Sequence, residues 1–303
     1  REPVSSQPNE PPKGHMFLDC CGNAEGYRDY LAAGSEWLLK QHGFDGIYTD
    51  GNAHVYPCTN RHHGCGYIDR EGTLRPTFPI FGTREYLKRM YRPVHANDPD
   101  GYLVNHVSYN TFIPTMSFTD VYYTGEHENY EDLLKCRVRW MAKPWGIWPI
   151  LLGGDSHSYE PMYTMYGLLH GTSIWTQGAT GRNDAQRKNV NLWNTYDEFG
   201  YRDAEWIPRF EAEERGITHA VADGVECSLY LRPGERALLV VGNTLHEVAE
   251  TQVEVDLAQM GLADAEVRAY NALSGREMPL VDGKKLQVHV RPTSFVLGRI
   301  DRR

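Results

Sequence analysis

The feature that most limits the fold of this sequence is an alternation of short apolar runs with longer helical stretches between residues 15 and 194. This order is typical of βαβ units, which build a parallel sheet. The predicted strands are 15–20, 44–50, 102–107, 116–123, 147–154 and 173–177. The predicted helices lie near 26–42, 83–91, 130–141, 160–169 and 184–194.

Six such strands are two fewer than the eight that close a (β/α)₈ barrel. We therefore predict an α/β fold, a TIM-type barrel of which this chain holds strands three to eight. The missing N-terminal part of the barrel then lies outside this sequence or is supplied by a partner chain or by the lead-in. An open doubly wound sheet is the alternative, but no glycine-rich phosphate turn follows any predicted strand.

Beyond about residue 204 the pattern changes to short strands at close spacing, separated by turns such as Pro233-Gly234 and Asp282-Gly283. The pattern predicts a C-terminal all-β sandwich. Its predicted strands are 226–232, 237–243, 251–257, 266–272, 285–290 and 294–300. The predicted organisation is a polar, proline-rich lead-in at 1–14, a partial barrel at 15–203 and the sandwich at 204–303.

Charge and composition narrow the range of partners. A net charge of −9 argues against binding to nucleic acid or to an anionic membrane, both of which need a basic face. No apolar run is long enough to span a bilayer. The 7 Trp and 19 Tyr favour a carbohydrate partner, because aromatic rings stack on the apolar faces of sugars. The sequence begins at Arg1 rather than Met, which is compatible with a processed chain. It leaves the location open and only favours a secreted or periplasmic one.

Nearly every predicted barrel strand ends in, or is followed by, a carboxylate or an imidazole. These residues are Asp19, Asp50, His106, Asp120, Glu126, Asp155 and His157. In parallel barrels the catalytic groups lie at the carboxyl ends of the strands and in the loops that follow. Charged groups at such places are partly desolvated, which is unfavourable without a purpose or a partner. The set therefore predicts a functional site at this end of the sheet.

Two of these segments predict an acid pair. Asp50 is the last residue of a predicted strand, and Gly51 lets the backbone turn away. Asp120 and Glu126 belong to the next candidate segment, where Gly125 precedes Glu126. Glycoside cleavage needs two carboxyls, one to protonate the leaving oxygen and one to attack or to activate water. We predict Asp50 as nucleophile and Glu126 as acid/base, with Asp120 as a further catalytic candidate; a turn Asp and a solvated loop Glu are the alternatives.

Other polar and aromatic residues near the strand ends are candidates for binding substrate. They are Asp19, His63, His106, Trp148, Asp155 and His157.

The loop 57–66 is rich in Cys and His, and we expect it to pack over the catalytic face near Cys20 and Cys21. Thiolate and imidazole are the usual ligands of Zn²⁺. A zinc site made by Cys20, Cys58, His63 and Cys65 is therefore an alternative. The spacing between Cys58 and Cys65 is not that of a standard zinc knuckle, so a Cys58–Cys65 disulfide or simple packing is favoured and no cofactor is expected.

Several segments in combination resemble a bacterial family of glycoside hydrolase domains, over residues 15–300. They are FDGIYTDG, CTNRHHGCGYID, REYLKRMYR, HVSYN and MSFTDVYYTGEH. More distantly, the chain is similar to retaining α-galactosidase and α-glucosidase barrels and to endo-α-N-acetylgalactosaminidases. That resemblance implies an Asp nucleophile after the fourth strand and an acid/base carboxyl after the sixth, which are Asp50 and Glu126 here. The chain has Tyr48 where those enzymes carry a Lys, so their substrate and anomeric preference do not transfer.

The leading interpretation is a retaining glycosidase that acts on an oligo- or polysaccharide. Two other classes stay open: a carbohydrate-binding barrel without catalysis, and a metal-dependent hydrolase centred on the Cys58–Cys65 loop. The sequence does not specify the sugar or the linkage.

Overall fold

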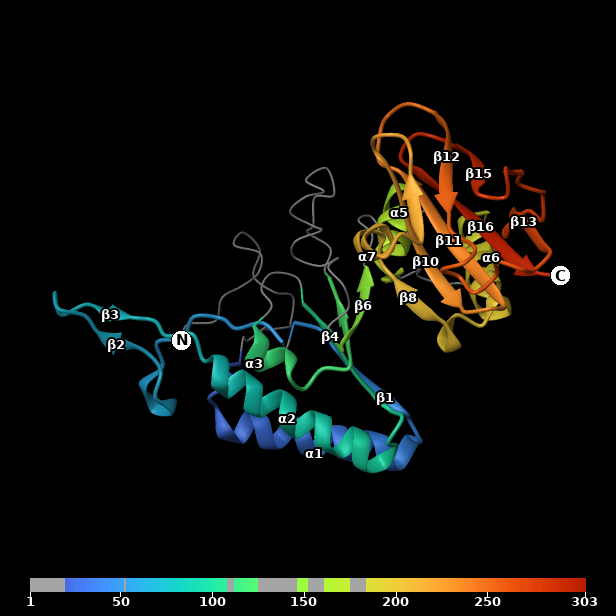
Figure 1. The fold of residues 1–303 in the computed structure, drawn as a ribbon. Helices are drawn as coiled ribbons and strands as arrows, with labels where there is room; N and C mark the ends of the chain where they lie inside the picture. The colour runs from blue at the N-terminus through green and yellow to red at the C-terminus, as the bar shows by residue number, and fades with distance from the viewer. Residues whose placement is uncertain (1–19, 52, 108–111, 125–145, 152–160, 175–183) are drawn as a thin grey trace. The chain divides into compact units, whose positions relative to one another are not determined.

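The computed structural model describes residues 20–51, 53–107, 112–124, 146–151, 161–174 and 184–303. The chain forms two compact units (Figure 1). The first unit comprises residues 1–127 and 146–148, and the second comprises 128–145 and 149–303. Within the described ranges, no helix is both long enough and apolar enough to cross a membrane.

The first unit is built on three parallel strands with β4 in the middle. They are β1 (Gly46–Thr49), β4 (Tyr102–His106) and β5 (Val121–Tyr123). In the register, Thr49 is opposite Asn105, and His106 is opposite Tyr123. The carboxyl ends of the three strands therefore lie at one edge of the sheet.

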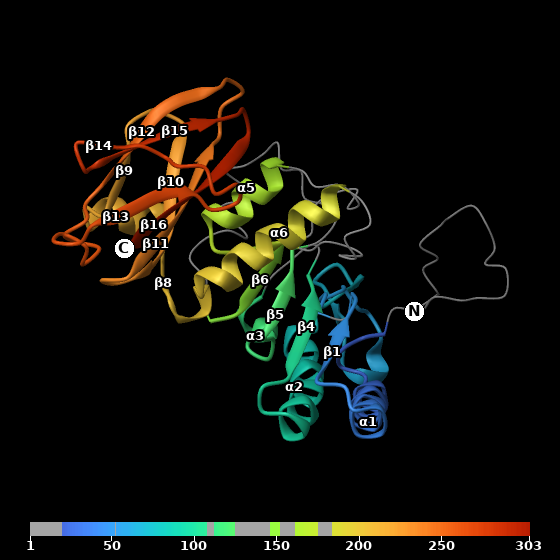
Figure 2. The same ribbon diagram turned by 90° about the vertical axis from the view of Figure 1, so that its right-hand side faces the viewer.

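Two helices of the first unit run side by side along one face of these strands (Figures 1 and 2). They are α1 (Glu25–His42) and α2 (Ile80–Asn97), and a short helix, α3 (Ile113–Met116), follows β4. Leu87 and Val94 of α2 and Leu103 of β4 are fully buried. Because side chains alternate along a strand, the face that carries Leu103 also carries Asn105, while His106 points to the other face.

The segment between β1 and α2 is a loop with little regular structure. It contains a short 3₁₀ turn, η1 (Arg61–His63), and a two-stranded hairpin of β2 (Tyr67–Ile68) and β3 (Leu74–Arg75). An isolated antiparallel bridge joins Cys58 to Thr77 at the base of the loop.

The second unit combines α/β elements with an all-β part. Its parallel pair is β6 (Trp148–Leu151), which starts at the last residue of the first unit, and β7 (Ser173–Ile174). Its helices are α5 (Pro161–Leu169), α6 (Asp184–Phe199) and the shorter α7 (Arg209–Glu214), and a 3₁₀ turn, η2 (Tyr201–Asp203), follows α6.

The all-β part consists of two antiparallel sheets. One has the order β13-β16-β11-β10-β8, and the other has the order β14-β15-β12-β9. The strands are β8 (Glu205–Ile207), β9 (Thr218–Ala220), β10 (Val225–Arg232), β11 (Arg236–Asn243), β12 (Ala249–Val255), β13 (Val267–Asn271), β14 (Leu280–Val281), β15 (Lys285–Val290) and β16 (Ser294–Arg302). Leu229, Leu239, Val253 and Leu286 are fully buried in the apolar core that both sheets share.

Helix α5 packs on the larger of these sheets. The Ser228 hydroxyl of β10 donates a hydrogen bond of 2.7 Å to the carbonyl oxygen of Leu169, the last residue of α5. Gly242 of β11 allows the close approach, because a Cβ there would lie 2.6 Å from Leu169 Cδ1. The compact second unit thus holds α5 together with the sandwich, whereas the predicted domain boundary lies between them, at residue 204.

Most predicted elements are present at their predicted places. Five of the predicted barrel strands correspond to β1, β4, β5, β6 and β7, and all six predicted sandwich strands are found, with the short β8, β9 and β14 in addition. The strand predicted at 15–20 and the helix predicted at 130–141 lie outside the described residues, apart from Cys20. The described strands do not close a barrel.

One predicted strand is wrong over half its length. Residues 116–123 were expected as one strand, but α3 ends at Met116 and β5 begins only at Val121. Pro114 stands in the first turn of α3, where proline is favourable, and the Thr115 hydroxyl donates to the Phe112 carbonyl oxygen. These local preferences start a helical turn before the strand.

A cavity in the buried core of the sandwich should lower the stability of the protein. Leu239→Ala removes a fully buried side chain from the shared core, and we expect the free energy of unfolding to fall by about 2–5 kcal/mol. The measurement is urea unfolding followed by circular dichroism. The control Val248→Ala changes an exposed side chain and should stay within about 0.5 kcal/mol of the parent. Equal effects of the two variants would contradict the assignment of this core.

Candidate functional site

Four side chains gather at the carboxyl ends of the strands of the first unit, on the face turned away from α1 and α2. Tyr48 and Asp50 come from β1 and the residue after it, His106 ends β4 and Tyr123 ends β5. Residues two apart on a strand point to the same side, and the register pairs His106 with Tyr123. We call these four residues the strand-end cluster.

The imidazole of His106 is the centre of the strand-end cluster. Its Nδ1 lies 3.1 Å from Asp50 Oδ1 and 3.0 Å from the Tyr48 hydroxyl. One ring nitrogen cannot donate and accept at once. The tautomer with a proton on Nδ1 donates to the carboxylate, and the other accepts from the Tyr48 hydroxyl. The negative charge of Asp50 favours the first arrangement.

Burial differs sharply between these two partners. The side chain of His106 is 8% exposed, whereas that of Asp50 is 73% exposed. A carboxylate that is open to solvent and is contacted by an anchored imidazole is accessible to a bound molecule and has a preferred orientation. Gly51 follows with φ of +70°, a conformation that few side chains tolerate, and it turns the chain away from the carboxylate.

Tyr123 is the fourth member of the strand-end cluster, and its ring lies next to those of Tyr48 and His106. Its ring meets the Tyr48 ring edge-on, with centroids 5.6 Å apart. Burial raises the pKa of Tyr123 well above its usual value, and the neighbouring Tyr48 adds to the shift. Tyr123 is therefore a neutral phenol throughout the pH range in which enzymes work.

The structure brings together two of the residues predicted from the sequence, Asp50 and His106. Four other predicted site residues lie outside the described part of the chain. They are Asp19, Glu126, Asp155 and His157.

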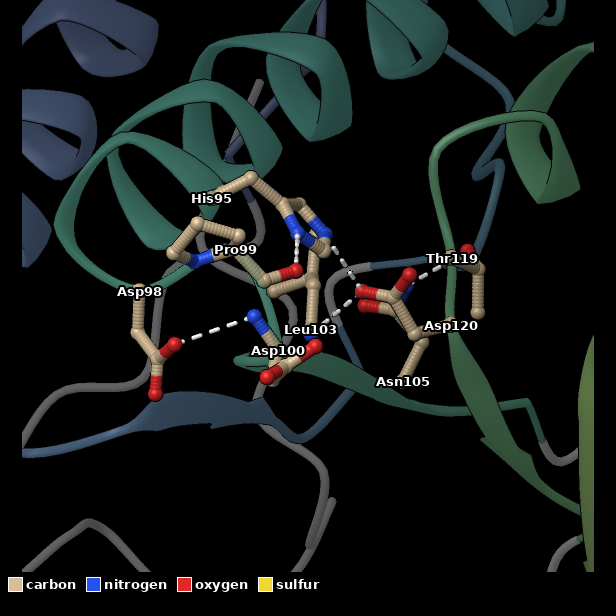
Figure 3. A network of polar contacts seen from close by, with 8 residues as sticks. All are labelled: His95, Asp98, Pro99, Asp100, Leu103, Asn105, Thr119 and Asp120. Carbon is tan, nitrogen blue, oxygen red and sulfur yellow. Dashed lines mark hydrogen bonds and ion pairs between the residues drawn. The ribbon is translucent and has the colours of Figure 1, made fainter.

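Asp120 lies at the opposite end of the sheet from Asp50. It was expected near the end of its strand, but it directly precedes β5, because residues 116–120 are not extended. Its Oδ2 accepts hydrogen bonds from the backbone N–H of Leu103, at 2.8 Å, and from His95 Nε2, at 3.0 Å (Figure 3). The contacts of Asp120 thus join β4 and α2 to the amino end of β5.

Trp148 also lies at this amino end. Its backbone N–H donates a 2.8 Å hydrogen bond to the carbonyl oxygen of Asp120, and its side chain is 41% exposed. Trp148 begins its strand, so the structure does not bring it to the edge at which Asp50 lies.

His63 belongs to a second group of side chains, in the loop after β1. The ligand atoms of Cys21, Cys58, His63 and Cys65 all lie within 4.8 Å of one another. Cys58 and Cys65 are not bonded to each other, so the favoured disulfide is not formed. Cys21, rather than the expected Cys20, completes the group.

Burial also sets the proton affinities in this second group. It raises the pKa of the Cys21 thiol to about 12, and the adjacent sulfurs of Cys65 and Cys58 add to the shift. Burial lowers the pKa of His63, which favours the neutral imidazole that a metal ion needs.

Sequence reasoning missed the roles of Tyr48 and Tyr123. A signal was present for Tyr48, because it stands two residues before Asp50 on a strand and must share its face. For Tyr123 the decisive fact is the register with His106, which a single sequence does not reveal.

Several known structures with a similar fold are glycoside hydrolases. A β-L-arabinopyranosidase of glycoside hydrolase family 27 from Geobacillus stearothermophilus matches with a TM-score of 0.54 at 12% identity, over 92% of this chain and 63% of that one. The α-galactosidase I of Mortierella vinacea gives 0.54 at 9% identity, over 95% and 73%. A maltogenic α-amylase, AmyB, from Thermotoga neapolitana gives 0.53 at 12% identity, over 100% and 73%.

The chain shares its fold with glycoside hydrolases. At 9–12% identity this likeness establishes the fold alone. The chain also spans less than two thirds of the length of the arabinopyranosidase. No family model and no curated protein sequence matches the chain.

The contacts of Asp120 predict a role in stability. Asp120→Ala removes the acceptor of the Leu103 N–H, a group on a fully buried residue. A buried donor without a partner destabilises by about 1–3 kcal/mol, and we expect a matching fall in the free energy of unfolding, measured by urea titration. Asp100→Ala, which removes an exposed carboxylate three residues after the end of α2, is the control and should be nearly neutral. A stable Asp120→Ala variant would show that this hydrogen bond is unimportant.

Proposed function

We propose that this chain forms part of a retaining glycoside hydrolase in which Asp50 is the nucleophile. The observation that carries the proposal is the placement of an exposed carboxylate at the carboxyl end of a parallel strand, in contact with His106. Parallel barrels carry their catalytic groups at this end. The fold shared with glycosidases supports the same interpretation.

The proposal includes the assignment of the strands. We propose that β1 is the fourth strand of a (β/α)₈ barrel and that β4, β5, β6 and β7 are the fifth to eighth. Asp50 then follows the fourth strand and Glu126 follows the sixth. The first strands come from a preceding part of the polypeptide or from a partner chain.

The proposed reaction has two steps. A carboxylate oxygen of Asp50 attacks the anomeric carbon, and the bond to the leaving oxygen breaks as Glu126 protonates that oxygen. In the second step Glu126 takes a proton from water, the water oxygen attacks the anomeric carbon, and the bond to Asp50 breaks. The product is the free sugar with its original anomeric configuration.

Two neighbours prepare Asp50 for attack. His106 Nδ1 lies 3.1 Å from Oδ1 of Asp50, and in the proposed reaction it orients the carboxylate so that the other oxygen attacks. Tyr48 contacts the same imidazole nitrogen and occupies the place at which related barrels carry a Lys. Its ring is 53% exposed, so it also offers a face on which a sugar can stack. We propose a neutral oligo- or polysaccharide as substrate, since the net charge of the chain is −9.

The Asp50→Asn substitution tests the nucleophile. It keeps the size and the hydrogen-bonding capacity of the side chain but removes its nucleophilic charge, and we expect hydrolysis of aryl glycosides to fall at least about a thousandfold. The matched control is Asp45→Asn, which makes the same change at an exposed position just before the same strand and should keep near-parental rates. Release of the aryl alcohol is the measurement, over a panel of aryl glycosides.

Two outcomes would redirect the proposal. Near-normal rates of Asp50→Asn with loss in Asp120→Asn would transfer the catalytic role to Asp120. Binding of sugars by the parent, measured by calorimetry, without hydrolysis of any substrate would favour the carbohydrate-binding alternative.

Stereochemistry tests the mechanism. We expect the first-formed sugar to keep the anomeric configuration of the substrate, because a covalent intermediate on Asp50 inverts the centre twice. Proton NMR of the early reaction reads the anomer directly. Glu126→Ala should spare substrates with good leaving groups, which need little protonation. An inverted first product would exclude Asp50 as a nucleophile and imply a carboxyl separation of roughly 6.5–9.5 Å, which admits a water.

A further inference from the structure

Three thiols and one imidazole meet where the loop after β1 lies against the segment before α1. Cys58, His63 and Cys65 belong to the loop, whereas Cys21 comes from the segment before α1. The Sγ atoms of Cys21 and Cys65 are 3.6 Å apart, and Cys58 Sγ lies 3.2 Å from His63 Nε2. All four ligand atoms lie within 4.8 Å of one another. A disulfide bond is about 2.05 Å long, so the 3.6 Å separation is that of two separate sulfurs.

The 3.6 Å and 3.2 Å separations are close to the edge length of a metal-centred tetrahedron, and the largest separation in the group is at most 4.8 Å. Bonds of about 2.3 Å to sulfur and about 2.0–2.1 Å to nitrogen place tetrahedral ligand atoms roughly 3.5–3.8 Å apart. Soft thiolates with an imidazole in tetrahedral arrangement select zinc over the hard cations that prefer oxygen. The donor set is three sulfurs and one nitrogen, a usual composition of structural zinc sites.

We propose that Cys21, Cys58, His63 and Cys65 bind one zinc ion that fastens the loop after β1 to the segment before α1.

The backbone around the ligands is shaped to bring them together. Asn60 caps the 3₁₀ turn through a 2.9 Å hydrogen bond from the His62 N–H to its side chain. Gly64 and Gly66, on either side of Cys65, both have φ of +77°, a left-handed conformation that favours glycine and ends the 3₁₀ turn at Gly64. The turn therefore directs His63 and Cys65 toward the sulfur of Cys58.

Cys21, the fourth ligand, is positioned by a close contact between its own segment and the start of α2. Gly22 packs against the start of α2, where a Cβ on it would lie 2.6 Å from the backbone nitrogen of Thr83. A Cβ on Gly82 would lie 2.8 Å from the nitrogen of Asn23. Neither position has room for a side chain. The two glycines therefore allow the backbone next to Cys21 to approach α2 closely, and this approach places Cys21 near the loop.

The sulfurs also receive the hydrogen bonds that thiolates need. The Asn23 backbone N–H donates to Cys21 Sγ at 3.4 Å, and its side-chain Nδ2 donates to Cys65 Sγ at 3.3 Å. The Asn60 backbone N–H donates to Cys58 Sγ at 3.4 Å. Such donors orient the ligands of metal sites and offset the negative charge that gathers on them.

The site is closed by protein on all four positions. Cys58 and Cys65 are 4% and 0% exposed, and Cys21 and His63 are partly buried. A catalytic zinc keeps one position for water or substrate, whereas a structural zinc has four protein ligands. The metal is therefore structural, and the proposal stands independently of the glycosidase chemistry at Asp50.

Metal analysis of the purified chain, without a histidine tag, is the test. After growth with zinc and exhaustive dialysis, the parent should contain about one zinc per chain by mass spectrometry of the metal. Cys21→Ser should lose most of it. The matched control is the adjacent Cys20→Ser, which should keep its zinc because Cys20 is exposed and outside the group. A parent without zinc, or zinc retained equally in Cys21→Ser and Cys20→Ser, would overturn the proposal.

Two further measurements keep the test decisive if a ligand variant fails to fold. Replacement of zinc by cobalt(II) in the parent should give the strong visible absorption of a tetrahedral site and a thiolate charge-transfer band. Asn23→Ala keeps every ligand but removes one donor to Cys65, and it should weaken zinc affinity about 10- to 100-fold, measured by competition with a chelating dye. A weak, octahedral cobalt spectrum of the parent would contradict the site. So would a zinc affinity of Asn23→Ala equal to that of the parent.

Discussion

The in-register pairing of β1, β4 and β5 is the constraint on which the rest of the first unit depends. The buried amide of Asn105 fixes this register, because it accepts from the Thr49 hydroxyl on one side and donates to Thr119 Oγ1, at 2.7 Å, on the other. A slip by one residue would turn the amide to the opposite face of the sheet and leave its polar atoms without these partners. An unsatisfied buried polar group destabilises by about 1–3 kcal/mol, so the network selects one register.

The register assigns different roles to the two ends of the sheet. At the amino end, the Asp120 carboxylate accepts hydrogen bonds from the Leu103 backbone N–H and from His95, so it serves a structural role. At the carboxyl end, Asp50 has His106 as its anchor and is otherwise open to solvent. Asp50 follows β1 and Asp120 precedes β5, so these two Asp residues lie at opposite ends of parallel strands and have opposite surroundings. This asymmetry is the reason for choosing Asp50 rather than Asp120 as the proposed nucleophile.

The sequence predicted where strands and helices occur better than where they start and which side chains meet. Alternating patterns located β1 and β4, and the Gly after Asp50 indicated the end of its strand. The position of Asp120 was missed, because the stretch before β5 is apolar and strand-like although a proline-started turn precedes it. The choice of Cys21 over Cys20 depends on the Gly22 contact with α2. Contacts between segments about sixty residues apart cannot be predicted from the local sequence pattern.

The proposed zinc site and the strand-end cluster are linked by one short stretch of chain. Asp50 and the bend at Gly51 stand at its start, and Cys58 stands at its end, held to Thr77 by a backbone bridge. Ala53 and Val55 within it are buried, at 1% and 8% exposure. The proposed metal at Cys58 would add a further restraint to the chain that follows Asp50. Such a restraint would favour catalysis by an exposed carboxylate, because a nucleophile reacts faster when it is already oriented before the substrate binds.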